Sequence, residues 1–190
     1  MSRIVAACSI VLSCILFIGC SKPTPTESLI DAASNGDVKS VVGLIKGVPF
    51  DATDEDGETS LHWATSGCHM DVVQQLIDLG ANVNYVDHAG RTPLMVTATA
   101  LRGKGYSADT MPIRNQIAAL LIKHGADVNR ADEGGRTALH CAVGDRNPDL
   151  IRMLLAAGAD KSTKDSQGYT PLYLARSWGY DQAAAALEGK

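Results

Sequence analysis

The chain has 190 residues, a formal net charge of −4 and an apolar share of 45%, which fits one globular unit and excludes a largely disordered chain. The acidic balance argues against nucleic acid as a partner, because binding to phosphates needs a basic surface. With 18 glycines and an aromatic share of 5%, the composition favours short elements joined by tight turns, as in a protein built from internal repeats.

The amino-terminal segment has the features of a secretion signal. An apolar run over residues 4–18 is, at about 15 residues, too short to span the roughly 30 Å hydrocarbon core of a bilayer comfortably. The run ends in Phe17-Ile18-Gly19-Cys20, which resembles the bacterial lipobox, although Phe17 replaces the usual leucine. The alternatives are an ordinary cleaved signal peptide and an uncleaved anchor.

The lipobox resemblance implies a lipoprotein. Residues 1–19 are then the signal peptide, Cys20 carries the lipid, and the protein lies in the periplasm. Ser21 after the cysteine implies sorting to the outer membrane. Residues 20–28 are expected to form the lipidated end and a tether, within which the alternating prolines of Ser21–Thr26 favour an extended polyproline II segment of about 19 Å.

Four downstream segments share a pattern of aspartate, glycine, threonine and leucine. They begin at Asp54, Asp87, Asp132 and Asp165, and their glycines follow one another at intervals of 33, 45 and 33 residues. Gly-Ala pairs that begin at residues 80, 125 and 158 keep the same register. The unit is therefore 33 residues long, and one unit carries an insertion of 12 residues within 101–115.

This pattern resembles the ankyrin repeat, which has the same period. The resemblance covers residues 29–190 and implies an all-α repeat solenoid of about five units, including degenerate terminal ones, each a helix-turn-helix with a β-hairpin turn. A Thr-Pro pair begins the first helix with a side-chain cap, and the apolar spacing in Val72–Ile77 and Leu150–Leu155 predicts the second. Helices this short are marginal alone, so stacking of the units is expected to stabilise them.

No catalytic or metal-binding motif occurs in the sequence: it has no phosphate-binding glycine loop, no H-E-x-x-H, no G-x-S-x-G and no C-x-x-C. His62 and His140 occupy the histidine position of the repeat, where the resemblance implies hydrogen bonds between neighbouring units. Cys68 and Cys141 lie in alternate units, too far apart for a disulfide. We therefore expect a protein without enzymatic activity, cofactor or metal.

The resemblance also implies that the hairpin tips and first helices line a concave groove that binds a partner. Carried over to this chain, the candidate partner-binding residues are Glu55, Asp56, Glu58, His88, Arg91, Glu133, Arg136, Asp145, Gln167, Tyr169 and Trp178. Charged tips can also be solvated turns, and Trp178 can simply cover the end of the stack.

The insertion is a second candidate surface. It carries Arg102, Lys104, Tyr106 and Met111 and is expected between the two helices of its unit, at the edge opposite the hairpins. There it is either a further contact surface or a tolerated loop.

The implied function is binding of another protein by a monomeric solenoid attached to the membrane through its lipid. Lipid-anchored periplasmic repeat proteins resemble immunity proteins, so inhibition of an antibacterial effector such as a secreted lipase is the favoured hypothesis. The alternatives are a scaffold or chaperone for a periplasmic enzyme such as catalase, and an adaptor in envelope assembly. A neighbouring gene for an effector favours the first, and one for a catalase favours the second.

Overall fold

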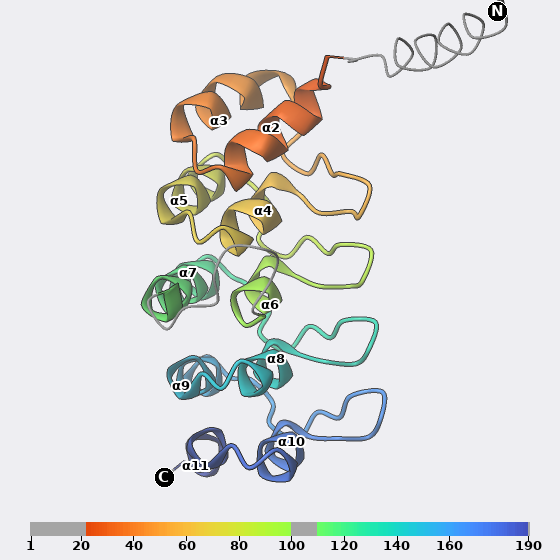
Figure 1. Cartoon of the computed structure of the whole chain (residues 1–190), viewed down its shortest axis with the longest axis vertical. Helices are drawn as coiled ribbons and strands as arrows, with labels where there is room; N and C mark the ends of the chain where they lie inside the picture. Colours follow the sequence, from red (N-terminus) through yellow and green to blue (C-terminus); the bar gives the residue numbers. More distant parts are fainter. Residues whose placement is uncertain (1–21, 100–109, 190) are drawn as a thin grey trace, which may run out of the picture.

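The computed structural model describes residues 22–99 and 110–189. These residues form stacked helical pairs, with looped arms that project to one side between successive pairs (Figure 1). The helices are α2 (Pro25–Ser34), α3 (Val38–Leu44) with the 3-10 helix η1 (Ile45–Gly47), α4 (Ser60–Ser66), α5 (Met70–Asp78), α6 (Pro93–Thr97), α7 (Met111–Lys123), α8 (Ala138–Gly144), α9 (Pro148–Ala156), α10 (Pro171–Ser177) and α11 (Asp181–Glu188).

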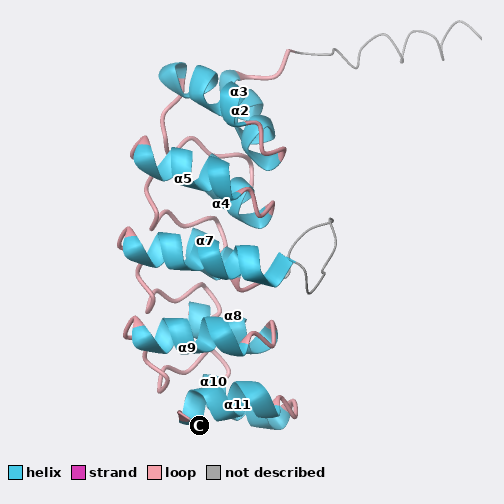
Figure 2. Cartoon of the chain, turned by 90° about the vertical axis from the view of Figure 1, so that its left-hand side faces the viewer, coloured by secondary structure: helices cyan, strands magenta, loops and turns pink. Residues whose placement is uncertain are grey.

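The helices form two layers. The inner layer, next to the arms, contains α2, α4, α6, α8 and α10, and the outer layer contains α3, α5, α7, α9 and α11 (Figures 1 and 2). Each helix contacts its partner in the pair and the helix of its own layer in the neighbouring pair. The predicted all-α solenoid of five units is confirmed.

Local sequence explains where the inner helices begin. Thr92 and Thr170 each accept a hydrogen bond from the backbone N–H three residues later, at 3.3 and 3.2 Å. A proline follows each threonine and supplies the φ of the first helical turn. The Thr-Pro pair therefore begins a helix as the sequence predicted.

The core runs without a break through the stack. Val72 and Val73 of α5 and Leu150 and Ile151 of α9 are fully buried, and they belong to the two apolar motifs of the sequence. Each such helix buries its apolar side against its own pair and the next pair. Since hydrophobic stabilisation is proportional to the area buried, a single unit would lose much of it.

The first helix begins earlier than expected. Helix α2 starts at Pro25, so residues 25–28, assigned above to an extended tether, are helical. Thr24 accepts a hydrogen bond from the backbone N–H of Glu27 at 3.1 Å, and the Glu27 carboxylate accepts one from the backbone N–H of Thr24 at 2.6 Å. This capping box outweighs the extended preference of the neighbouring prolines.

Part of the range assigned to the insertion is helical. Helix α7 has 13 residues, against nine in α5 and nine in α9, and its additional first turn takes up residues 111–114. Met111, predicted as part of a loop surface, is therefore helical. Arg102, Lys104 and Tyr106 lie outside the described residues, as do the predicted signal peptide and Cys20.

None of the helices that the structure describes combines the length and the apolar character needed to span a bilayer.

Candidate interaction surface

An aspartate side chain shapes each arm from within. The Oδ1 atoms of Asp54, Asp87, Asp132 and Asp165 each accept the backbone N–H groups two and four residues later, at 2.8 to 3.0 Å. The backbone N–H of each aspartate in turn donates to the carbonyl four residues later. The arms are therefore tight turns; between residues 22 and 99 and between 110 and 189, β pairing is limited to one isolated bridge, Thr53 with Thr59.

Neighbouring arms are joined to one another. The backbone N–H groups of His88, Glu133 and Ser166 donate to carbonyls in the preceding arm at 3.0, 3.0 and 2.8 Å. Gly90 and Gly135 permit this approach: they have φ values of 76° and 72°, and a Cβ on either would lie 2.9 Å from a backbone nitrogen of the next arm. The arms thus form a ladder that holds their tips at fixed spacing.

The two repeat histidines join neighbouring units, as predicted. In His62, Nδ1 lies 3.2 Å from the backbone nitrogen of Thr59, and Nε2 lies 3.1 Å from the carbonyl oxygen of Arg91 in the next arm. His140 bonds Thr137 and the Tyr169 carbonyl in the same way. An N–H can only donate, so Nδ1 is the acceptor and the proton is on Nε2. Burial lowers the pKa of both imidazoles, which keeps them neutral.

Two predicted partner-binding residues are instead buried in ion pairs. Glu58 is 6% exposed and bonds the guanidinium of Arg91 at 3.0 Å. Asp145 has a fully buried side chain, which Arg114 of α7 binds at 2.9 Å. Each pair crosses from one unit to the next, so these carboxylates join units and are not available to a partner. The guanidinium of Arg91, which was also predicted to bind a partner, is mostly used inside the protein, since it also binds Asp87.

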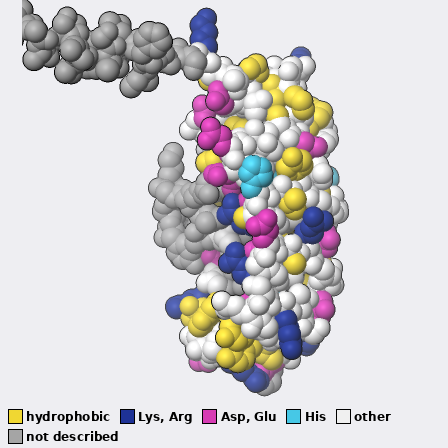
Figure 3. All heavy atoms as spheres, turned by 90° about the vertical axis from the view of Figure 1, so that its right-hand side faces the viewer, with side chains coloured by type: hydrophobic (Ala, Val, Ile, Leu, Met, Phe, Trp, Pro, Cys, Tyr) yellow, Lys and Arg dark blue, Asp and Glu magenta, His cyan; other side chains and the backbone are white. Residues whose placement is uncertain are grey.

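Five of the exposed predicted residues lie at the arm tips, whereas exposed Trp178 lies at the end of helix α10. Glu55, Asp56, His88, Glu133 and Gln167 are all exposed. In the face that carries the arms, acidic, basic and histidine side chains alternate along the stack, and hydrophobic and basic ones lie together at the lower end (Figure 3). The tips therefore present a varied set of side chains on a uniform backbone.

The last arm and the inner helices add aromatic residues. Tyr169 is half-buried because its ring stacks on Tyr173, with 4.7 Å between ring centroids. Tyr173 is 53% exposed, because it takes the place of His62 and His140 but no further described unit follows it. Trp63 of α4, also missed above, is partly exposed and donates to Asp54 at 2.7 Å. Trp63 occupies the same position in its repeat as the buried Cys141. The only sequence signal for its exposure is therefore the larger size of the tryptophan side chain.

Comparison with known proteins agrees with this geometry. Family profiles described as ankyrin repeats match residues 29–109 (three copies), 89–133 (a single repeat) and 121–175 (many copies). The chain belongs to the ankyrin-repeat family. As an ankyrin-repeat protein it is a protein-interaction module.

Curated relatives share this region. The B-cell lymphoma 3 protein homolog of Mus musculus is 29% identical over 165 residues, which cover 85% of this chain and 32% of that protein. Neurogenic locus notch homolog protein 1 is 31% identical in Homo sapiens and in Xenopus tropicalis, over 65% of this chain and 6% of those proteins. This ankyrin-repeat chain thus spans a third or less of the length of these relatives.

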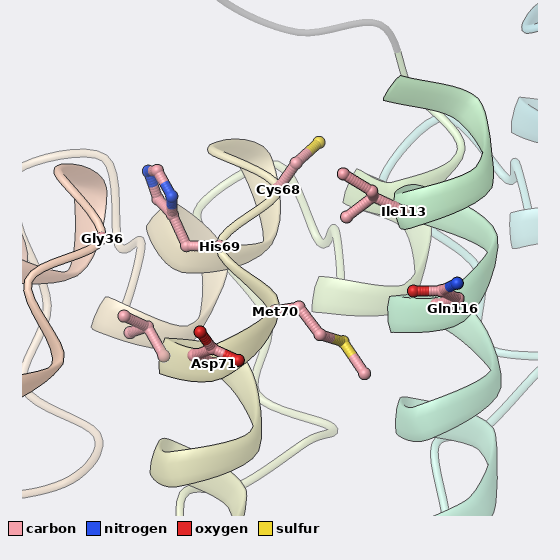
Figure 4. A pocket seen from close by; sticks show the side chains of 8 residues that line it. Gly36, Cys68, His69, Met70, Asp71, Ile113 and Gln116 are labelled. Atoms are coloured by element: carbon pink, nitrogen blue, oxygen red, sulfur yellow. The ribbon is translucent and has the colours of Figure 1, made fainter. Parts of the chain in front are cut away.

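A cavity of about 370 Å³ opens in this ankyrin array beside the first turn of α7. Cys68 and Ile113 point toward one another across it, whereas His69 points away toward Gly36 (Figure 4). The His69 ring bonds the carbonyl of Ser34 at 2.8 Å, so it does not activate the neighbouring thiol.

Of the cysteines within the described residues, neither Cys68 nor Cys141 is activated for chemistry. Burial raises the pKa of the Cys68 thiol and raises that of Cys141 to about 11, so both stay protonated near neutral pH and are poor nucleophiles. Both thiols are free. In the part of the chain that the structure describes, no three His, Cys, Asp or Glu side chains come together to hold a metal ion.

Proposed function

We propose that this ankyrin-repeat protein binds a partner protein at the bacterial envelope, and that it acts as an immunity protein that neutralises a periplasm-acting effector such as a secreted lipase. The proposal rests chiefly on the ladder of arms. It fixes Glu55, His88, Glu133 and Gln167 at regular spacing without using their side chains for the fold. A rigid surface of this kind loses little conformational entropy on binding.

The amino-terminal segment supports the envelope location. If Cys20 carries lipid, only residues 21–24 separate it from helix α2, and four residues reach no more than about 14 Å. The first unit would then lie against the membrane, with the arms of later units further from it. Such an inhibitor would meet a membrane-attacking effector at its place of action.

Lipidation is tested with a Cys20→Ala variant. Wild-type protein is expected in the detergent-soluble membrane fraction of the envelope, and the variant in the soluble or unprocessed fraction. Equal membrane retention of both proteins, with no difference in mass beyond the substitution, would exclude a lipid on Cys20.

The binding surface is tested by capture from detergent-solubilised envelope, followed by mass spectrometry. The test variant carries Glu55→Ala, Glu133→Ala and Gln167→Ala at three exposed tips. The matched control carries Asp71→Ala, Lys123→Ala and Gln182→Ala, which are exposed residues of the outer helices. We expect capture of an effector by wild type and control, and loss with the tip variant. Equal capture by all three would exclude the arm tips.

The immunity role is tested in cells. A deletion strain is exposed to attack by its wild-type sister cells and is expected to be killed unless the gene is restored. Unharmed survival would contradict an immunity role. Lowered peroxide resistance and catalase activity in the same strain would instead favour the scaffold function.

A further inference from the structure

Arg146 has a backbone conformation that its side chain disfavours. It lies in the turn between α8 and α9 with φ +54°. The equivalent positions of the first and last units are Gly36 and Gly179, with φ +74° and +68°. Left-handed backbone is unfavourable for residues with a Cβ. The turn therefore does not require an arginine, and glycine would be less strained at this position.

The Arg146 side chain is held on an aromatic surface. Its guanidinium carbon lies 4.0 Å from the ring centroid of Tyr180, within the range of a cation–π interaction. The Tyr180 ring is in turn 5.6 Å from that of Trp178. Trp178 is 48% exposed, and Arg146 is exposed as well. The three residues form one cluster at the turn edge of the fourth and fifth units, which we call the Arg-aromatic cluster.

The positive charge of Arg146, unlike that of most arginines within the described residues, is not paired with a carboxylate. Five other arginines form an ion pair with a carboxylate: Arg91, Arg114, Arg136, Arg152 and Arg176. Within residues 22–99 and 110–189, no carboxylate is paired with Arg146. The preceding Asp145 is bound to Arg114 and buried, and Asp181, which follows Tyr180, begins α11.

We propose that the Arg-aromatic cluster is a docking point for an acidic segment of a partner protein, in which a carboxylate lies next to an apolar side chain. The inference rests on the proposed protein-binding function and adds a second contact away from the arm tips. Stacking on Tyr180 occupies one face of the guanidinium and leaves its edge to bind a carboxylate in bidentate fashion. Trp178 supplies the apolar surface beside it. Arginine, tryptophan and tyrosine are the residue types enriched at binding hot spots.

The test uses the full chain and a peptide array as probe. The array holds 12-residue peptides with one Asp or Glu next to Leu or Phe, and matched peptides with Asn or Gln in its place. The test variant is Arg146→Gly, which relieves the left-handed strain and is expected to fold as well as wild type. The matched control is Cys68→Gly, at the equivalent turn of the second unit, where φ is +58°.

We expect wild type and Cys68→Gly to bind the acidic peptides about tenfold more tightly than their amide partners. Arg146→Gly should lose this preference while its thermal midpoint is unchanged or higher. The inference is overturned if acidic and amide peptides bind equally, or if Arg146→Gly retains the preference. It is also overturned if anionic lipid vesicles or RNA show the same dependence on Arg146 as the peptides, since the site would then be a general anion site.

The outcome is separable from that of the proposed function. If the tip variant abolishes capture of the envelope partner and Arg146→Gly leaves both capture and peptide preference intact, the arm tips are the binding surface and the proposal for the Arg-aromatic cluster is wrong. If the tip variant has no effect, the proposed binding by the arm tips is wrong, and the peptide array still tests whether the Arg-aromatic cluster binds an acidic segment.

Discussion

Replacing Arg114 by alanine is expected to destabilise the solenoid more than any substitution of an exposed charge. Arg114 donates to Oδ1 of Asp145 at 3.1 Å and to the carbonyl of Thr97 at 3.4 Å, and its Nη2 lies 2.9 Å from Oδ2 of Asp145 in an ion pair. The side chains are 8% and 0% exposed, so removal of the guanidinium takes a positive charge away from a carboxylate inside the protein. Arg114 belongs to the third unit and Asp145 to the fourth, so the loss falls on the contact between units.

The magnitude follows from the burial. Breaking one partner of a buried ion pair costs about 3–5 kcal/mol. In a chain of this size, 1 kcal/mol lowers the thermal midpoint by about 2–4 °C, so the variant should unfold about 6–20 °C below wild type. Urea unfolding followed by circular dichroism gives the free energy directly, and a thermal scan gives the midpoint.

The control is Arg152→Ala. Arg152 pairs with Asp149 within α9, but the side chains are 56% and 71% exposed, so its loss should cost no more than about 1 kcal/mol. The double variant Arg114→Ala/Asp145→Asn should recover part of the stability, because a neutral amide is easier to bury than a carboxylate. If Arg114→Ala costs no more than Arg152→Ala, the pair does not hold the two units together.

Three further predictions concern stability. The folded-state pKa of His62 and His140 is lowered by burial, so the unfolded chain binds more protons below about pH 6.5; stability should be full above that pH and fall with acidification, by up to about 1.4 kcal/mol per pH unit and histidine. Urea midpoints measured at pH 7.5 and 5.5 check this, and equal midpoints would contradict it. Gly36→Ala should cost about 1–3 kcal/mol, since its φ is +74° and its Cβ would lie 2.6 Å from the His69 ring. Gly43→Ala in helix α3, which meets no atom within 4 Å, should stabilise by about 0.5–1 kcal/mol in the same assay.

The candidate site was predictable in part. The exposed tips at Glu55, His88 and Gln167 follow from their places in the repeat, because each arm is shaped by an aspartate a few residues away in sequence. The burial of Glu58 and Asp145 did not follow, because their arginine partners are 33 and 31 residues away. A charged side chain in a turn looks solvated until its partner in the neighbouring unit is placed.

By itself, the sequence determined the repeating helical pair, the turns and the order of the units. Those features depend on local chemistry: a threonine cap, a proline, an aspartate that binds nearby N–H groups and a glycine at positive φ all act within about five residues. Only the tertiary structure decided which charges are buried between units, how far α7 extends, and that Arg146 lies over Tyr180 beside exposed Trp178. These depend on contacts between stacked units, and burial and charge pairing exist only once the units are stacked.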